Sequence, residues 1–290
     1  MNSKVIATIN AGVNPAGIAI TPNNRLAYVA NNNNYEIPGQ DSVTVIDLRH
    51  NVPLKTIYHS SFNQPYTITI NQDGTKAFVT NSGGSTITVI KILTNKVLHV
   101  IDGFDGPSGL VIVGDVGYVN NYGATPGLGS GNGHTVQMFN VETYKLIGTP
   151  INVGLAPAAI TADRKYVYTA NYVDGNPNTG TISKIRIRNN TLHSTIGPFL
   201  ENGISGPFDI IVRKHLAFVT NFGSNNFEPF GTTVSIINLR TNEIDNNITV
   251  GIQPSGIAID GRYAYVTNYN TLYAYVQRDP PPAQYMNLTP

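Results

Sequence analysis

Tyr28-Val29-Ala30-Asn31 is the first of six closely similar tetrapeptides in this chain. The later copies are Phe78-Val79-Thr80-Asn81, Tyr118-Val119-Asn120-Asn121, Tyr168-Thr169-Ala170-Asn171, Phe218-Val219-Thr220-Asn221 and Tyr265-Val266-Thr267-Asn268. Their final residues, here called the marker asparagines, lie 50, 40, 50, 50 and 47 positions apart. A period of about 40 to 50 residues is typical of stacked or radial repeats, in which no single repeat can bury its apolar face alone.

A proline precedes each marker asparagine by 14 or 16 residues. These prolines are Pro15, Pro65, Pro107, Pro157, Pro207 and Pro254. Between proline and asparagine lie an alternating apolar run, a polar turn such as Asp73-Gly74, and the Tyr-Val run. Alternating β-branched and aromatic residues around a polar turn predict a hairpin. We therefore expect each repeat to open with two antiparallel strands.

A third strand, which begins with Ser or Thr, follows each marker asparagine at a variable distance. These segments are 42–46, 86–90, 135–139, 181–185, 233–237 and 271–275. A less regular fourth strand follows, for example at 55–58 and 97–100. Because no helical period appears and each repeat holds four strands, the sequence predicts an all-β protein built as a β-propeller.

The two ends of the chain predict how the propeller closes. The last repeat leaves the pattern at 278–282, before a fourth strand, whereas residues 4–10 form a strand-like segment with no repeat of their own. We expect this N-terminal strand to join the last blade and close the ring, because closure removes unpaired strand edges. The prediction is a six-bladed β-propeller with four antiparallel strands per blade. It forms one domain, 1–279, with blades at about 13–60, 63–103, 105–153, 155–200, 205–250, and 252–279 plus 4–11, followed by a Pro-rich tail, 280–290.

The repeated pattern Pro-x-Gly-Ile-Ala-Ile, Tyr-Val-Thr-Asn and Thr-Val-x-Val-Ile-Asp resembles the YVTN family of β-propeller repeats. Residues 43–57 and 86–101 match this pattern especially well, and the resemblance covers about residues 4–278. It implies the fold and a relation to surface-layer-like and other exported proteins. The resemblance implies no activity, because the shared residues are structural and one fold hosts many functions.

Composition narrows the classes of partner. Only 12% of the 290 residues are charged and the net charge is +1, whereas about 25% charged residues is usual. Without a run of Lys and Arg, neither nucleic acid nor membrane insertion is expected. The chain has no cysteine, so no disulfide framework is expected. Residues 1–4 lead directly into the first predicted strand, so we read no signal peptide here. The resemblance and the low charge favour an exported, cell-surface or particle-surface setting.

Length variation is concentrated between the second and third strands. From the marker asparagine to the third strand the distances are 11, 5, 14, 10, 12 and 3 residues. In a propeller these loops emerge on one face, so four long loops are expected to wall that face. Variable loops on a rigid frame are where binding residues concentrate.

These loops, and the aromatic residues that follow four of the marker asparagines, supply most of the candidate binding residues. They are Tyr35, Glu36, Tyr122, His134, Tyr172, Asp174, Phe222, Phe227, Glu228 and Tyr269. Tyr, Asn, Ser and Gly together are typical of binding loops, and aromatic rings beside amides suit a sugar. The alternative interpretation is that Gly, Pro and Asn satisfy turn geometry and the aromatics cap the core.

Three further candidates, Tyr66, Phe208 and Asp209, lie one or two positions after a repeat proline. They are expected at the start of innermost strands, near a channel mouth. A carboxylate there can act as a metal ligand or general base, or it can accept hydrogen bonds from nearby backbone N–H groups. Of the two interpretations of Asp209 we favour the hydrogen bonds to backbone.

The marker asparagines suggest a second ligand hypothesis. Six amide oxygens around an axis could hold a hard cation such as Ca²⁺, as Asn and acidic residues do in lactonase-like propellers. The structural interpretation, which we favour, makes each Asn a strand-end residue that bonds its own backbone and tolerates a left-handed backbone conformation. No cofactor is expected, and Ca²⁺ is the alternative.

The most economical functional prediction is a non-enzymatic recognition or scaffold propeller that binds a protein or glycan through its long loops. One alternative is a metal-dependent hydrolase or lyase with a lactonase-like site at the channel mouth. The other is a purely structural unit of a surface assembly. The six histidines show no repeated relation to a Ser or carboxylate, so no catalytic residue is predicted.

Overall fold

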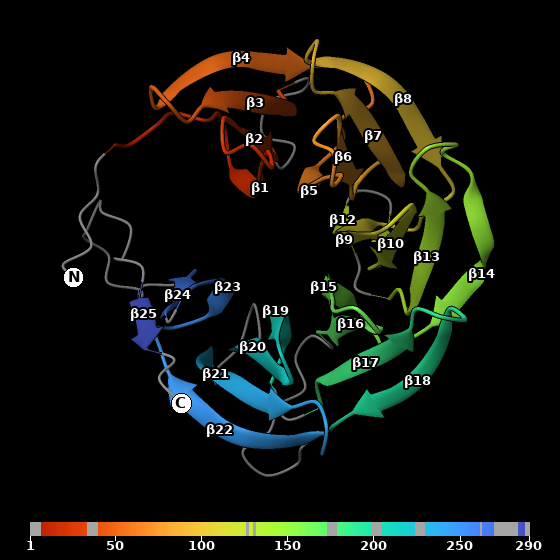
Figure 1. The fold of residues 1–290 in the computed structure, drawn as a ribbon, viewed down its shortest axis with the longest axis vertical. Helices are drawn as coiled ribbons and strands as arrows, with labels where there is room; N and C mark the ends of the chain where they lie inside the picture. Colours follow the sequence, from red (N-terminus) through yellow and green to blue (C-terminus); the bar gives the residue numbers. More distant parts are fainter. Residues whose placement is uncertain are drawn as a thin grey trace. The chain divides into compact units, whose positions relative to one another are not determined.

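A computed structural model describes residues 7–33, 40–125, 128–129, 132–172, 179–198, 205–223, 230–261, 263–269 and 284–287. In these residues every regular element is a β-strand, and no helix is present (Figure 1). Accordingly, no helix in this part of the chain is long and apolar enough to cross a membrane. The predicted all-β class is confirmed.

Five of the sheets have four antiparallel strands each. The first contains β1 (Pro15–Ile20), β2 (Leu26–Asn31), β3 (Ser42–Asp47) and β4 (Val52–Tyr58). The second contains β5 (Pro65–Ile70), β6 (Lys76–Asn81), β7 (Thr86–Lys91) and β8 (Lys96–Asp102). The third contains β9 (Pro107–Val113), β10 (Val116–Asn121), β13 (Thr135–Asn140) and β14 (Leu146–Asn152). The short strands β11 (Ala124–Thr125) and β12 (Leu128–Gly129) pair with each other between β10 and β13.

The fourth sheet contains β15 (Pro157–Ala162), β16 (Tyr166–Asn171), β17 (Thr181–Arg186) and β18 (Thr191–Ile196). The fifth contains β19 (Pro207–Arg213), β20 (Leu216–Gly223), β21 (Phe230–Asn238) and β22 (Glu243–Thr249). The described part of the last sheet has three strands, β23 (Pro254–Asp260), β24 (Tyr263–Asn268) and β25 (Gln284–Asn287).

Each sheet begins at a repeat proline, and its second strand ends near the marker asparagine. Proline and asparagine face each other as cross-strand partners, as in the pairs Pro15↔Asn31 and Pro207↔Asn221. The predicted opening hairpin is therefore confirmed, with the two sequence markers at its open end.

The residue before each repeat proline has a left-handed backbone, a feature that the sequence analysis did not identify. Its φ lies between 45° and 56° at Asn14, Gln64, Gly106, Ala156, Gly206 and Gln253. Only two of these six residues are glycine, so most positions accept the steric cost of a left-handed backbone. In five of the repeats the carbonyl of this residue accepts the N–H of the residue after the marker asparagine, as in Asn32 N to Asn14 O at 3.0 Å.

The chain divides into two compact units, and the division passes through the third sheet. The first unit comprises 1–119, 123–130 and 138–148, and the second comprises 120–122, 131–137 and 149–290. In each unit the opening strands of consecutive sheets lie side by side, as β1 does with β5 and β15 with β19. Within each unit, apolar side chains pack between consecutive sheets.

The cores repeat this pattern. In the first unit Tyr28 and Val43 pack with Ile68 and Val79, and Phe78 packs with Phe139 of the third sheet. In the second unit the core of the fourth and fifth sheets contains Tyr168, Ile182, Ile210, Ala217 and Ile237.

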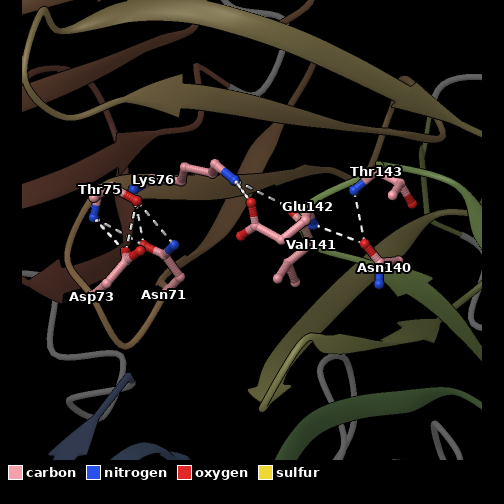
Figure 2. Close-up of polar contacts among 8 residues, drawn as sticks. All are labelled: Asn71, Asp73, Thr75, Lys76, Asn140, Val141, Glu142 and Thr143. Carbon is pink, nitrogen blue, oxygen red and sulfur yellow. Dashed lines mark hydrogen bonds and ion pairs between the residues drawn. The ribbon is translucent and has the colours of Figure 1, made fainter.

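Turn chemistry in the second sheet follows the sequence prediction of a hairpin (Figure 2). The Asn71 side-chain oxygen accepts the N–H groups of Thr75 at 3.1 Å and Lys76 at 2.9 Å. Asp73 accepts both the N–H and the hydroxyl of Thr75, at 2.9 and 2.6 Å. These Asx-type bonds close the turn between β5 and β6.

Lys76 then connects this turn to the next sheet, within the first unit (Figure 2). Its Nζ lies 2.6 Å from Glu142 Oε2 and 3.4 Å from the Val141 carbonyl. Asn140 holds that second turn by accepting the N–H of Glu142 at 3.0 Å and of Thr143 at 2.7 Å. A charged side chain thus links two turns that are far apart in sequence.

Two predictions about the chain ends need correction. The expected N-terminal strand, 4–10, is not formed by residues 7–10, which lie outside every strand; residues 4–6 are outside the described part. In the last sheet the place beside β24 that was predicted for residues 271–275 is taken by β25, which lies in the predicted tail, 280–290. The pairs include Tyr263↔Asn287 and Val266↔Gln284. The segment predicted as the third strand, 271–275, lies outside the described residues. The physical reason is that a strand edge binds any extended segment with free N–H groups.

Gly206 provides a test of the left-handed position. Its φ is +54°, and a Cβ there would lie 2.2 Å from the Gly223 carbonyl oxygen. We expect Gly206→Ala to lower the free energy of unfolding by about 2–4 kcal/mol, because backbone strain and a backbone clash add. Gly114 also has positive φ, +58°, but nothing lies within 4 Å of a Cβ. Gly114→Ala should therefore cost only about 1 kcal/mol. Equal losses in urea denaturation would contradict the close approach at Gly206.

Candidate functional site

Five aromatic residues of the second unit form the most distinctive cluster among the predicted site residues. Tyr172 meets Phe208 edge-on at 5.8 Å between ring centroids and Phe222 at 6.2 Å. Phe208 stacks on Phe222 at 4.9 Å, and Tyr269 lies 5.9 Å from Phe222. Tyr122 packs against the same group together with Ala156 and Ala158. We call these five side chains, Tyr122, Tyr172, Phe208, Phe222 and Tyr269, the aromatic cluster.

The strand ends place the aromatic cluster. Tyr172, Phe222 and Tyr269 each follow a marker asparagine, and their N–H groups donate to Ala156, Gly206 and Gln253 at 2.8, 3.0 and 2.8 Å. This bond ties each aromatic residue to the left-handed turn before its own repeat proline. The repeat therefore delivers one ring per sheet at the same end of consecutive sheets.

The side chains of the aromatic cluster differ in exposure: four are buried or half-buried and form its base, whereas Tyr269 forms an exposed edge. Tyr172 is fully buried and Phe222 is 3% exposed, whereas Tyr122 and Phe208 are half-buried. Tyr269 is 75% exposed. The base caps the core, as the structural interpretation expected, while Tyr269 presents a ring and a hydroxyl to solvent. A supported, exposed tyrosine offers a large contact area at low entropic cost.

Asp209 lies beside the aromatic cluster on β19, but its carboxylate is held by the backbone. Oδ1 accepts the N–H of Ile210 and Oδ2 accepts the N–H of Ile257, both at 2.8 Å. Burial raises the pKa of Asp209, and these two hydrogen bonds act in the opposite direction. The bond to Ile257 joins β19 to β23, and both bonds agree with the backbone interpretation that the sequence analysis favoured.

Two further predicted site residues lie in the described part of the chain. Tyr66 is half-buried on β5 of the first unit, and His134 is exposed, its carbonyl accepting the Val153 N–H at 2.8 Å. Five predicted residues lie outside the described part of the chain: Tyr35, Glu36, Asp174, Phe227 and Glu228.

Sequence reasoning missed Asp41, which lies in the first long loop. Its two carboxylate oxygens accept the N–H groups of Asn33 and Gln64, each at 2.9 Å. Asp41 therefore connects this loop to the left-handed turn before the second sheet. The sequence feature that could have indicated Asp41 is its position just before Ser42, the first residue of the third strand.

Five of the six marker asparagines are buried, and Asn268 is half-buried. In four repeats the Nδ2 group donates to two hydroxyls of the third strand, at 2.8–3.1 Å. These hydroxyl pairs are Ser42 and Thr44, Thr86 and Thr88, Thr181 and Ser183, and Thr233 and Ser235. The strand-end position agrees with the favoured interpretation, but two details differ. These amides donate to hydroxyls of the third strand and not to their own backbone, and no marker asparagine has a positive φ. Among the described residues, no group of three or more His, Cys, Asp or Glu side chains is arranged to hold a metal ion.

Comparison with curated sequences gives one short match. The chain is 42% identical over 57 residues to the PE-PGRS family protein PE_PGRS18 of Mycobacterium tuberculosis (strain ATCC 25618 / H37Rv). That match covers 20% of this chain and 12% of the relative, so the chain spans only a small part of that protein's length. No protein-family model matches the chain, and the YVTN resemblance stays a resemblance.

Comparison with solved structures shows the fold. Kuenenia stuttgartiensis hydrazine synthase aligns with a TM-score of 0.70 at 18% identity, covering 91% of this chain and 77% of that one. A putative 6-phosphogluconolactonase from Bacteroides fragilis NCTC 9343 aligns at 0.67 and 18%, covering 88% and 77%. U3-55K aligns at 0.66 and 15%, covering 91% and 77%. These neighbours are β-propellers, and at such low identity the likeness shows a β-propeller fold alone.

Asn221 tests the structural role of the marker asparagines. Asn221→Ala removes the bonds to Thr233 and Ser235 and leaves two hydroxyls inside the sheet without their donor. We expect the free energy of unfolding to fall by about 2–3 kcal/mol. The control is Asn152→Ala at an exposed position, which should change it by less than about 0.5 kcal/mol. Loss of a Ca²⁺-induced thermal shift in Asn221→Ala, without loss of stability, would favour the cation hypothesis instead.

Asp209 gives a pH-dependent prediction. Because burial raises the folded-state pKa of Asp209, the folded state holds this proton more tightly than the unfolded state. The contribution of Asp209 to stability therefore falls as pH rises from the ordinary Asp pKa to the raised one. Asn does not titrate, so the stability of Asp209→Asn relative to wild type should increase with pH in that window. Urea titrations between about pH 3 and about pH 8 measure this difference. A difference that decreases with pH would contradict the raised pKa.

Proposed function

We propose that this protein is a non-enzymatic recognition or scaffold propeller whose aromatic cluster contacts a protein or glycan partner. The observation that carries the proposal is the exposure of Tyr269, 75%, on a base of buried aromatic rings. A rigid base keeps the ring in place, so binding costs little side-chain entropy. The flat face of Tyr269 suits a sugar ring or a side chain of a partner.

The metal-dependent hydrolase or lyase is the weaker candidate. It requires a carboxylate that is free to bind a cation or move a proton, whereas both oxygens of Asp209 accept backbone N–H groups. The structural neighbours named as enzymes share the fold only, and a fold of this kind hosts unrelated activities. A purely structural unit of a surface assembly would use sheet edges in place of Tyr269.

We also propose a blade number and a cellular location for this protein. The six repeat markers support six blades, with the last sheet as the sixth, and the YVTN resemblance supports an exported, cell-surface or particle-surface location. A density map with seven sectors about the axis would contradict the blade count. Localisation of the full-length protein by immunogold labelling, with all label inside the cell, would contradict the setting.

Tyr269→Ala is the direct test of the binding face. On a glycan array, or with a protein partner purified from the source cells, we expect the variant to lose at least tenfold in affinity, about 1.4 kcal/mol, as for an interface hot spot. Tyr58→Ala is the matched control, because Tyr58 is 60% exposed on β4 of the first unit. Both variants should retain the wild-type melting temperature.

The outcomes separate the hypotheses. Glycan binding that Tyr269→Ala removes and Tyr58→Ala retains supports a carbohydrate partner. If no glycan on the array binds, and a partner protein binds Tyr58→Ala but not Tyr269→Ala, the result supports protein recognition. A partner that binds both variants as tightly as wild type would rule out the aromatic cluster as the contact face. Turnover of a lactone that requires millimolar Ca²⁺ would favour the enzyme.

A further inference from the structure

The fourth sheet and its turns carry a concentration of positive charge that the sequence does not show as a run. Five of the chain's eighteen Lys and Arg residues are found there: Arg164, Lys165, Lys184, Arg186 and Arg188. Arg164, Lys165 and Arg188 are exposed and Arg186 is half-buried, whereas Lys184 is only 7% exposed. In a chain with a net charge of +1, this sheet is locally and strongly positive.

These charges converge on one buried ring, Tyr166. Lys184 Nζ lies 4.4 Å from the ring centroid and Lys165 Nζ lies 5.2 Å from it. The Arg186 guanidinium carbon lies 6.0 Å from the same centroid, and the His193 ring stacks on Tyr166 at 5.2 Å. Four basic side chains therefore surround one aromatic ring, at separations over which salt screens their mutual repulsion only in part.

The contact between Arg186 and His193 fixes the donors available to a ligand. Arg186 Nη2 lies 2.9 Å from His193 Nδ1. Because a guanidinium can only donate, His193 Nδ1 accepts, and the remaining proton of a neutral imidazole is on Nε2. Partial burial and the charges of Arg186, Lys184 and Lys165 lower the pKa of His193. Arg186 keeps further N–H groups for another acceptor.

One described carboxylate, Asp163, lies in this group, and its charge opposes the lowering of the Lys184 pKa by burial. A single carboxylate offsets only part of the several positive charges. Asp163 Oδ1 accepts the N–H groups of Lys165 and Tyr166 at 2.7 Å each. Asp163 Oδ2 accepts the Tyr168 hydroxyl at 2.9 Å. Among the described residues no ion pair involves Lys165, Lys184 or Arg186. Lys184 instead donates to the Leu239 carbonyl at 3.1 Å.

We propose that Lys165, Arg186 and His193 form a binding site for a tetrahedral oxyanion, the phosphate or sulfate group of a ligand. The Arg186 fork offers paired N–H donors, Lys165 an ammonium, and His193 its Nε2–H. Lys184 lies beneath the site, where it adds positive potential without reaching the ligand. An oxyanion here relieves the repulsion among the basic side chains. This site is built from different residues than the aromatic cluster and does not depend on the proposed function.

The test follows the His193 ring by NMR while inorganic sulfate or phosphate is added to the full chain, with chloride at matched ionic strength as the reference. Bound oxyanion favours the protonated ring, so we expect the pKa of His193 to rise with sulfate and phosphate and not with chloride. O-phosphoserine and N-acetylglucosamine 6-sulfate then distinguish a phosphorylated from a sulfated source. A pKa of His193 that responds equally to chloride and sulfate would overturn the site.

Substitutions of single residues show which side chains donate hydrogen bonds to the oxyanion. Arg186→Ala and Lys165→Ala should each weaken sulfate binding at least tenfold in calorimetry, and Arg186→Lys should restore only part of it, because Lys lacks the planar fork. Arg240→Ala is the matched control, since Arg240 is exposed on the turn after β21. Denaturation midpoints show whether each variant is folded. If Arg186→Ala does not fold, His193→Gln, which keeps a side-chain donor, is the variant whose sulfate affinity is measured. Equal weakening in Arg240→Ala, or full binding by Arg186→Ala, would refute the assignment.

Discussion

The hydrogen bonds of the marker asparagine are the constraint on which each sheet depends. In four repeats the amide donates to two hydroxyls of the third strand while its residue faces the repeat proline on the first. One side chain thus fixes three strands at the same end of the sheet. A buried amide that lost these acceptors would cost more than an ordinary hydrogen bond contributes, so the strand end is strongly specified.

This constraint also explains where the variable and functional features lie. In five repeats the N–H of the residue after the marker asparagine donates to the left-handed turn. The backbone position of that residue is therefore fixed. In the second unit Tyr172, Phe222 and Tyr269 occupy these positions, and their rings belong to the aromatic cluster. The long loops begin just beyond this point, so a rigid frame supports the variable segments.

Electrostatics differ between the two units. In the first unit Lys76 is paired with Glu142 at 2.6 Å, so charge is compensated where turns of adjacent sheets meet. In the second unit Lys184 replaces an apolar residue in the middle of its strand and donates to the Leu239 carbonyl. The cationic groups of Lys184, Lys165 and Arg186 lie over the ring of Tyr166, and among the described residues none of them forms an ion pair with a carboxylate. The low overall charge of the chain therefore conceals a local positive centre.

By itself the sequence determined the all-β class, the opening hairpin of each repeat and the spacing of the repeats, because these follow from local alternation and a regular period. It did not find the left-handed residues before the prolines, since four of the six are not glycine. Only the tertiary structure decided that Asp209 binds the backbone of β23, that β25 pairs with β24, and that Lys165, Lys184, Arg186 and His193 share one tyrosine. These contacts join residues distant in sequence, and no local pattern encodes which strand edge or ring such a side chain will meet.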